Sequence, residues 1–133
     1  MANRENYARG FAFPNEGFVQ RAIEDKFAVL GFKAEDAGDA DLISVDPKTG
    51  ERWVVEAKGK TKASGLDFRT GLGQLVQRMT DQNSKYAVAF PDIPQFVKQC
   101  RQVKPWVRKL LNLHWLLVGE DGAVRIYGPD DTL

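Results

Sequence analysis

The sequence predicts an α/β protein with a central mixed sheet flanked by helices, and three stretches carry that prediction. Residues 16–30 place apolar side chains at helical spacing, which is typical of an amphipathic helix. Residues 41–58, DLISVDPKTGERWVVEAK, read as a β-hairpin because two Val- and Ile-containing runs flank the turn sequence PKTG. Residues 86–90, YAVAF, form a continuous apolar run that is typical of a strand buried on both faces.

The remaining elements follow in order along the chain. Residues 1–13 are expected to be irregular, residues 14–128 to form one domain, and residues 129–133 to be a tail that frays. Asn15 is the expected N-cap of the first helix, and Gly31 ends it. The other expected elements are a short strand at 32–34, a helix at 66–82 capped by Ser64 or Asp67, a helical region at 95–111 broken by Pro105, and strands at 115–118 and 124–127.

Length and composition bound the class of protein. The 133 residues suit one domain, and 43% hydrophobic with 28% charged residues is ordinary for a globular protein. No apolar run has membrane-spanning length and no signal peptide is visible, so we expect no membrane partner. A single cysteine, Cys100, excludes an internal disulfide and fits the cytoplasm. With His114 the only histidine, oxygen ligands must hold any metal, which favours Mg²⁺ or Mn²⁺.

The hairpin gathers charged side chains at one end. If Asp46 faces Glu51 across the turn, then Asp41 lies opposite Glu56, and Lys58 shares their face. Two opposed carboxylates repel each other, and a divalent cation between them would remove that repulsion. The hairpin therefore suggests metal-assisted hydrolysis of a phosphodiester, in which Lys58 orients or activates water. The alternative is a solvated hairpin end whose charges cluster without a function.

The spacing of these residues resembles the core motif of the PD-(D/E)XK nuclease superfamily. Asp41 is followed by fourteen residues and then by Glu56-Ala57-Lys58, with Ala40 where the family name has proline. The resemblance covers roughly residues 16–90 and implies a restriction-endonuclease-like fold with an αβββαβ core. It also implies that Asp41 and Glu56 bind Mg²⁺, with Mn²⁺ as a substitute, and that Lys58 is catalytic.

The resemblance implies two more site residues. A glutamate on the first helix often joins the metal site in this family, and Glu16 is the first choice, with Glu24 second on the stripe that both share with Gln20. A glutamine on the helix after the triplet occurs in several branches, and Gln74 matches it. On that helix Gly71 and Gly73 lower helix propensity and leave room for the sheet or a ligand to approach.

The charges are segregated along the chain. Residues 48–109 carry a net charge of +8, whereas residues 1–47 carry −4 and residues 110–133 carry −3. A basic central block favours a polyanionic partner, although distant charges in the fold could neutralise it. The candidate phosphate contacts are Lys60, Lys62, Arg69 and Arg78. The tryptophans could stack on bases, although core or interface roles are more usual; they are Trp53, Trp106 and Trp115.

We therefore expect a Mg²⁺-dependent nuclease that hydrolyses DNA, in a context of repair, recombination, transposition or phage defence. It could act as a homodimer or within a larger nuclease assembly, because a symmetric dimer most easily cuts both strands. The alternative is a non-catalytic module of the same fold that binds nucleic acid or protein. An enzyme acting on a small phosphate-containing molecule is disfavoured because the sequence has no glycine-rich phosphate loop.

Overall fold

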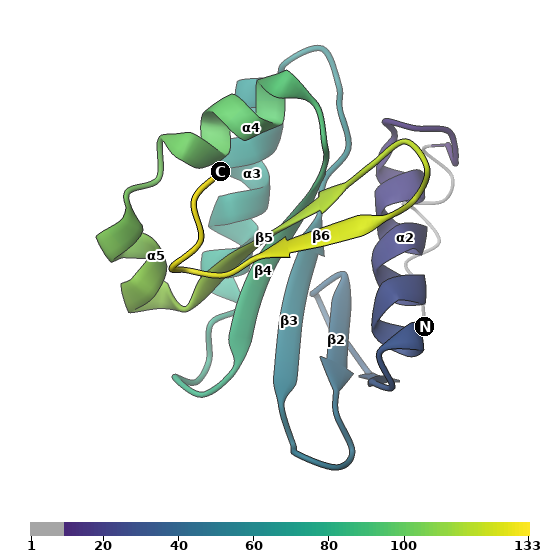
Figure 1. Cartoon of the computed structure of the whole chain (residues 1–133), viewed down its shortest axis with the longest axis vertical. Coiled ribbons are helices and arrows are strands. Elements are labelled where there is room, and N and C mark those ends of the chain that lie inside the picture. Colours follow the sequence, from purple (N-terminus) through teal and green to yellow (C-terminus); the bar gives the residue numbers. More distant parts are fainter. Residues whose placement is uncertain (1–9) are drawn as a thin grey trace.

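The computed structural model describes residues 10–133. They form a six-stranded mixed sheet with helices packed against it (Figure 1). Within that range no helix is long and apolar enough to cross a lipid bilayer. The elements in chain order are α2 (Glu16–Val29), β1 (Lys33–Glu35), β2 (Leu42–Val45), β3 (Arg52–Ala57), α3 (Ser64–Gln77), β4 (Lys85–Pro91), α4 (Pro94–Arg101), α5 (Pro105–Leu111), β5 (Leu113–Val118) and β6 (Val124–Tyr127). This order agrees with the order expected from the sequence.

The strands lie side by side in sequence order from β1 to β6. The β1–β2, β2–β3 and β5–β6 pairs are antiparallel, whereas β3, β4 and β5 run parallel to one another. Figure 1 shows α2 on one side of the sheet and α3, α4 and α5 on the other. The α/β class with a central mixed sheet is therefore confirmed, and helices flank that sheet on both faces.

Two hydrophobic clusters fill the space between the sheet and its helices. Successive side chains of a strand point to opposite faces, so β3 contributes to both clusters. The α2 cluster includes Ile23, Phe27, Trp53, Val55 and Ala57. The α3 cluster includes Val54, Phe68, Leu75, Val88 and Phe90. By the same alternation, Glu56 and Lys58 follow Val54 on the face that α3 covers.

The register of the β2–β3 hairpin is the one expected from the sequence. Leu42 pairs with Val55, and Ile43 pairs with Val54. The turn is closed by an Asp46 N–H that donates to the Glu51 carbonyl at 2.8 Å. One step beyond Leu42 in this register, Asp41 lies opposite Glu56.

Helix α3 differs from its expected bounds, because it begins at Ser64 and ends at Gln77 rather than spanning 66–82. Neither expected cap residue caps it, and Ala63 occupies the N-cap position. The Asp67 carboxylate accepts hydrogen bonds from the Thr61 N–H and hydroxyl, both at 2.8 Å, and closes the loop before the helix. Local side-chain to backbone bonds of this kind compete with regular helix caps.

The C-terminal residues pack against the body instead of fraying. The buried Arg108 guanidinium donates to the carbonyls of Gly128 and of Asp131, the latter at 2.9 Å. Arg101 Nε donates to the carbonyl of Leu133 at 3.2 Å. A buried guanidinium needs acceptors, and the backbone of residues 128–133 supplies them. The expectation of a frayed tail is therefore wrong.

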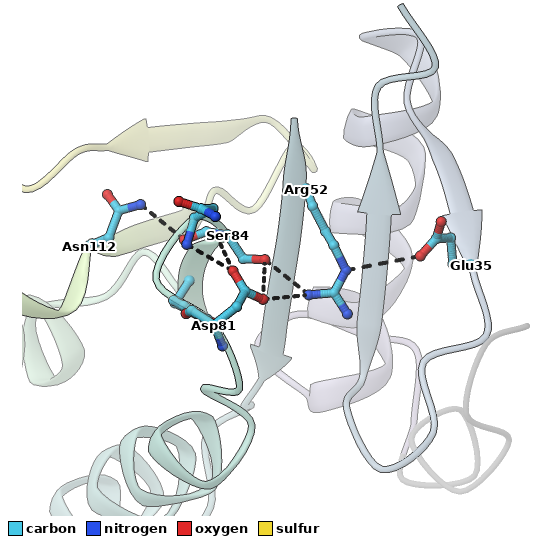
Figure 2. Close-up of polar contacts among 7 residues, drawn as sticks. Glu35, Arg52, Asp81, Ser84 and Asn112 are labelled. Atoms are coloured by element: carbon cyan, nitrogen blue, oxygen red, sulfur yellow. Dashed lines mark hydrogen bonds and ion pairs between the residues drawn. The ribbon is translucent and has the colours of Figure 1, made fainter. Parts of the chain in front are cut away.

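A polar cluster lies at the start of β3, at the opposite end of the strand from Glu56 (Figure 2). The Arg52 guanidinium donates to the Ser84 hydroxyl at 3.0 Å and lies 3.5 Å from Asp81 Oδ2. Asn112 Nδ2 donates to the Ser84 carbonyl at 3.0 Å. Backbone N–H donors, first that of Ser84, hold the pKa of Asp81 below its usual value. The cluster joins β3 to the turn before β4 and to the start of β5.

Candidate active site

The structure brings the carboxylates of Asp41 and Glu56 together across the β2–β3 pair. The Asp41 N–H donates to Glu56 Oε2 at 3.0 Å. In return, Asp41 Oδ2 accepts the N–H of Ala57 at 2.8 Å. The backbone of one strand therefore holds the carboxylate of the other in both directions. This reciprocal pairing holds two carboxylate groups, both hard oxygen donors, near each other.

Glu56 has a strongly perturbed environment. Its side chain is only 2% exposed. Burial, together with the neighbouring negative charge of Asp41, raises the pKa of Glu56 to about 7. The Asp41 N–H, Arg78 and Lys58 act in the opposite direction. Because the charge of Asp41 disfavours the ionised form of Glu56, a divalent cation between the two side chains would favour ionised Glu56.

Lys58 reaches from the end of β3 to the start of α2. Its Nζ lies 3.8 Å from Glu16 Oε1, and the two side chains are 14% and 9% exposed. The Lys58 N–H donates to the Ala89 carbonyl at 2.9 Å, so its backbone continues the β3–β4 pairing. Both charged groups of this ion pair are therefore largely shielded from solvent. Glu16 is therefore placed to orient the Lys58 ammonium group.

The loop after Lys58 presses against the first turn of α2. The Lys60 N–H donates to the Pro14 carbonyl at 3.0 Å. A Cβ on Gly59 would lie 2.2 Å from the backbone nitrogen of Glu16, which no side chain tolerates. Only glycine permits this close approach. The loop and the helix are thereby locked together beside the Glu16–Lys58 pair.

Gln20 is a buried residue of the site that was not predicted from the sequence. Its Nε2 donates to the Asp41 carbonyl at 2.9 Å and to Glu24 Oε2 at 3.0 Å. The amide thus connects α2 to Asp41 at the start of the hairpin. Glu24 is the acceptor of its other hydrogen bond. The only signal in the sequence was the shared helical stripe of Glu16, Gln20 and Glu24.

The acidic side chains do not form a complete metal cage. Among residues 10–133, no group of three or more His, Cys, Asp or Glu side chains is arranged to hold a metal ion. Glu16, Asp41 and Glu56 are thus not gathered as a three-ligand set. The Asp41–Glu56 pair still has the chemistry that suits Mg²⁺, which commonly takes one or two carboxylates and completes its shell with water and phosphate oxygens.

Two surface pockets are lined by residues of the candidate site, one by Lys58 and Glu16 and the other by Asp41. A pocket of about 270 Å³ lies between the start of α2, the loop after β3 and the start of α3, and the side chain of Lys58 lines it. Its other polar lining residues are Asn15, Glu16, Lys60, Thr61, Asp67 and Thr70. A smaller pocket of about 190 Å³, between α2 and the β1–β2 edge, is lined by Asp41 and Glu24. Asp41 therefore lines the smaller pocket and Lys58 the larger one.

The expected phosphate contacts occupy varied positions. Lys62 and Arg69 are exposed, whereas Lys60 and Arg78 are partly buried. The Arg78 Nε is enclosed and has no hydrogen-bond partner among the described residues. Gln74 is also partly buried. It lies one helical turn after Gly71, which contacts the Lys58 side chain.

The three tryptophans have different environments. Trp53 and Trp115 are buried in the core, whereas Trp106 is 68% exposed on α5. Stacking on a base is therefore open to Trp106 but not to the other two.

Comparison with protein-family models finds none that matches the chain, and a search of curated proteins finds no significant match.

Proposed function

We propose that this chain is a Mg²⁺-dependent nuclease of the PD-(D/E)XK type that hydrolyses phosphodiester bonds in DNA. The order of α2, the three strands β1–β3, α3 and β4 supports a restriction-endonuclease-like core. The net charge of +8 over residues 48–109 supports a polyanionic substrate.

The observation that carries the proposal is the reciprocal bonding of Asp41 and Glu56 next to Lys58. A structural hairpin gains nothing from placing two carboxylates together with one of them buried. The arrangement is useful when a cation occupies the space between them. The adjoining ammonium group then suits a substrate whose reacting centre carries negative charge.

Each side chain has a defined task in this proposal. Asp41 and Glu56 hold Mg²⁺, or Mn²⁺ as a substitute. When bound, the ion lowers the pKa of its water and polarises the scissile phosphate. Lys58 orients the attacking water and stabilises the charge that develops on the phosphate oxygens. Glu16 orients the Lys58 ammonium group through their ion pair, and Gln20 positions Asp41 by donating a hydrogen bond to its carbonyl.

The pocket of about 270 Å³ beside Lys58 is the proposed entry for the phosphate. Lys58 and Lys60 both line it, which gives it two cations at the point where the backbone of a nucleic acid would arrive. Glu16 and Asp67 are the acidic side chains of its lining, and each has a described partner, Lys58 and Thr61 respectively.

A cleavage assay tests the proposal. Purified protein is incubated with supercoiled plasmid, linear duplex, single-stranded DNA and a four-way junction, each with Mg²⁺, Mn²⁺ or EDTA. Asp41→Ala and Lys58→Ala are compared with the wild type. Lys48→Ala is the matched control, because it removes a lysine from the exposed hairpin turn at the other end of β3.

The expected result is cleavage that needs the metal, Asp41 and Lys58, and that Lys48→Ala leaves intact. Circular dichroism checks that the variants keep their fold. Wild-type activity in a folded Asp41→Ala or Lys58→Ala protein would refute the assignment.

A second candidate is a non-catalytic binding module of the same fold. The observation that favours it is the enclosure of Glu56, which is only 2% exposed. Such a module would bind DNA equally well in Mg²⁺ and in EDTA and would cleave none of the four substrates. Isothermal titration with Mg²⁺ separates the two, because the module would show no heat that depends on Asp41 and Glu56.

A further inference from the structure

Helices α4 and α5 present a basic surface that the proposed catalytic site does not use. Residues 93–119 contain five lysines and arginines and no aspartate or glutamate. Within this set Arg108 is buried and donates to backbone carbonyls, and Lys109 lies 3.4 Å from Asp130. The remaining cations, Lys98, Arg101 and Lys104, are exposed, and Arg101 also donates through Nε to the Leu133 carbonyl at 3.2 Å. We call these three cations together with Trp106 the α4–α5 surface.

An aromatic side chain is exposed two residues after Lys104. Trp106 follows Pro105 in the first turn of α5 and is 68% exposed. Leu110 lies one turn further along the same helix and is 74% exposed. Leaving a tryptophan in water forgoes one of the largest burial gains available to a side chain. The flat ring is thus free to stack against a planar group, and the flanking charges select an anionic one.

The surface begins at the same end of the sheet as the candidate active site. Strands β3 and β4 are parallel, and Ala57 pairs with Ala89 near the carboxyl ends of both. Helix α4 begins at Pro94, a few residues beyond the end of β4, so it starts near Lys58's end of the sheet. Figure 1 shows α4 beside α3, and α5 farther along the same face. The two helices therefore extend from the end of the sheet that holds Lys58 along the face that α3 covers.

We propose that the α4–α5 surface binds an unpaired stretch of the nucleic acid, with Trp106 stacked on a base and Lys98, Arg101 and Lys104 on phosphates. The proposal rests on nucleic acid being the ligand, but not on cleavage. Sequence-independent single-strand binding commonly combines a basic track with stacking aromatic side chains. In a duplex the bases are already stacked on one another, so Trp106 discriminates in favour of unpaired nucleotides.

The charges also argue against another copy of this chain as the occupant. A two-fold interface pairs the same patch with itself. Lys98, Arg101 and Lys104 would then face like charges, which destabilises association. An acidic protein partner is the remaining alternative, and the binding experiment distinguishes it.

The experiment measures DNA affinity in EDTA, where no metal-dependent cleavage takes place. A fluorescently labelled single-stranded oligonucleotide and its blunt duplex are titrated with wild type, Trp106→Ala and Trp106→Phe. We expect Trp106→Ala to weaken single-strand binding ~10-fold, because it removes the ring on which one base stacks. Trp106→Phe keeps a stacking ring and should retain most of the affinity. Duplex binding should change little in either variant.

Salt dependence separates the cations from the ring. The double variant Lys98→Gln, Lys104→Gln should lower the slope of log K against log salt by about 0.7 per lysine on single strands. Trp106→Ala should leave that slope unchanged. The matched control is Lys48→Gln, which removes an exposed lysine from the hairpin turn and should alter neither quantity. Intrinsic fluorescence of Trp106 should also be quenched by the oligonucleotide.

Three results would overturn the proposal. The first is unchanged single-strand affinity in both Trp106→Ala and the double lysine variant, which would leave an acidic protein as the occupant. The second is an equal loss on duplex and single strand in Trp106→Ala, which would exclude stacking on unpaired bases. The third is no binding of any DNA by the wild type. If the variants change binding as expected but the wild type cleaves no DNA, the proposed nuclease activity is refuted and the proposed binding role of the α4–α5 surface stands.

Discussion

Gly71 of α3 lies directly against the side chain of Lys58. A Cβ built on Gly71 would lie 2.7 Å from Lys58 Cγ and 3.2 Å from Val88 Cγ1. The helix therefore reaches the sheet closely at this point only because it lacks a side chain there. The aliphatic stem of Lys58 fills the space, and its ammonium extends to Glu16. The two helical glycines in the sequence suggested a close approach, and it is observed at Gly71. A Cβ built on Gly73 would meet nothing within 4 Å.

Gly71→Ala should displace Lys58 and lower activity. The new methyl group forces the lysine stem to shift, and small misplacements of a catalytic group are costly. We expect kcat for DNA cleavage to fall ~10- to 100-fold. Gly73→Ala is the matched control on the same helix. It should leave kcat unchanged and stabilise the protein by ~0.5–1 kcal/mol, because alanine favours the helix. Equal activity of the two variants would show that Lys58 is not positioned by this contact.

Glu56→Gln should stabilise the metal-free protein while abolishing cleavage. The pKa of Glu56 is about 7 in the folded state, against an ordinary value of 4.5. In EDTA the wild type should therefore lose stability as pH rises from about 4.5 through 7, because the folded state must give up a proton that it prefers to keep. At pH 8 the Gln variant should be more stable by on the order of 2–3 kcal/mol.

Urea denaturation of both proteins in EDTA across this pH range measures the difference. Adding Mg²⁺ at pH 8 should then stabilise the wild type and leave Glu56→Gln unaffected, because binding to the folded state alone raises stability. Parallel pH profiles for the two proteins would contradict the assigned burial cost of Glu56.

Glu16→Gln should lower kcat without changing the Mg²⁺ concentration needed for half-maximal activity. Glu16 pairs with Lys58, and the amide would keep its shape while losing the charge. Cleavage rates over a Mg²⁺ titration separate the two roles. A large rise in the Mg²⁺ requirement would instead make Glu16 a metal ligand, as the family resemblance implied.

Ser84→Ala should destabilise the protein by about 1–2 kcal/mol and leave cleavage intact. The Ser84 hydroxyl is buried, accepts from Arg52 at 3.0 Å and donates to Asp81 Oδ2 at 2.9 Å (Figure 2). Its removal leaves the guanidinium with fewer acceptors at the start of β3. Thermal unfolding measures the loss. A matching fall in kcat at a temperature where the variant is folded would mean that this cluster also supports the active site.

Local patterns were sufficient to predict the hairpin and its charged end. The turn sequence and the alternating strands set a register in which Asp41 meets Glu56, and that register is the one observed. Strand periodicity alone placed Lys58 on the same face. Helix bounds were less reliable, since α3 ends at Gln77, before a turn in which Asp81 accepts the Asn83 N–H at 2.8 Å.

What the sequence by itself determined was the α/β class, the order of elements and the pairing of two carboxylates within one hairpin, because these depend on residues close along the chain. The tertiary structure decided which distant side chains joined them. It brought Gln20 to the Asp41 carbonyl and Glu16 to Lys58, it placed Gly71 against Lys58, and it left Trp106 exposed. These relationships arise from the packing of helices on the two faces of the sheet, and side chains brought together by packing leave no fixed spacing in the sequence.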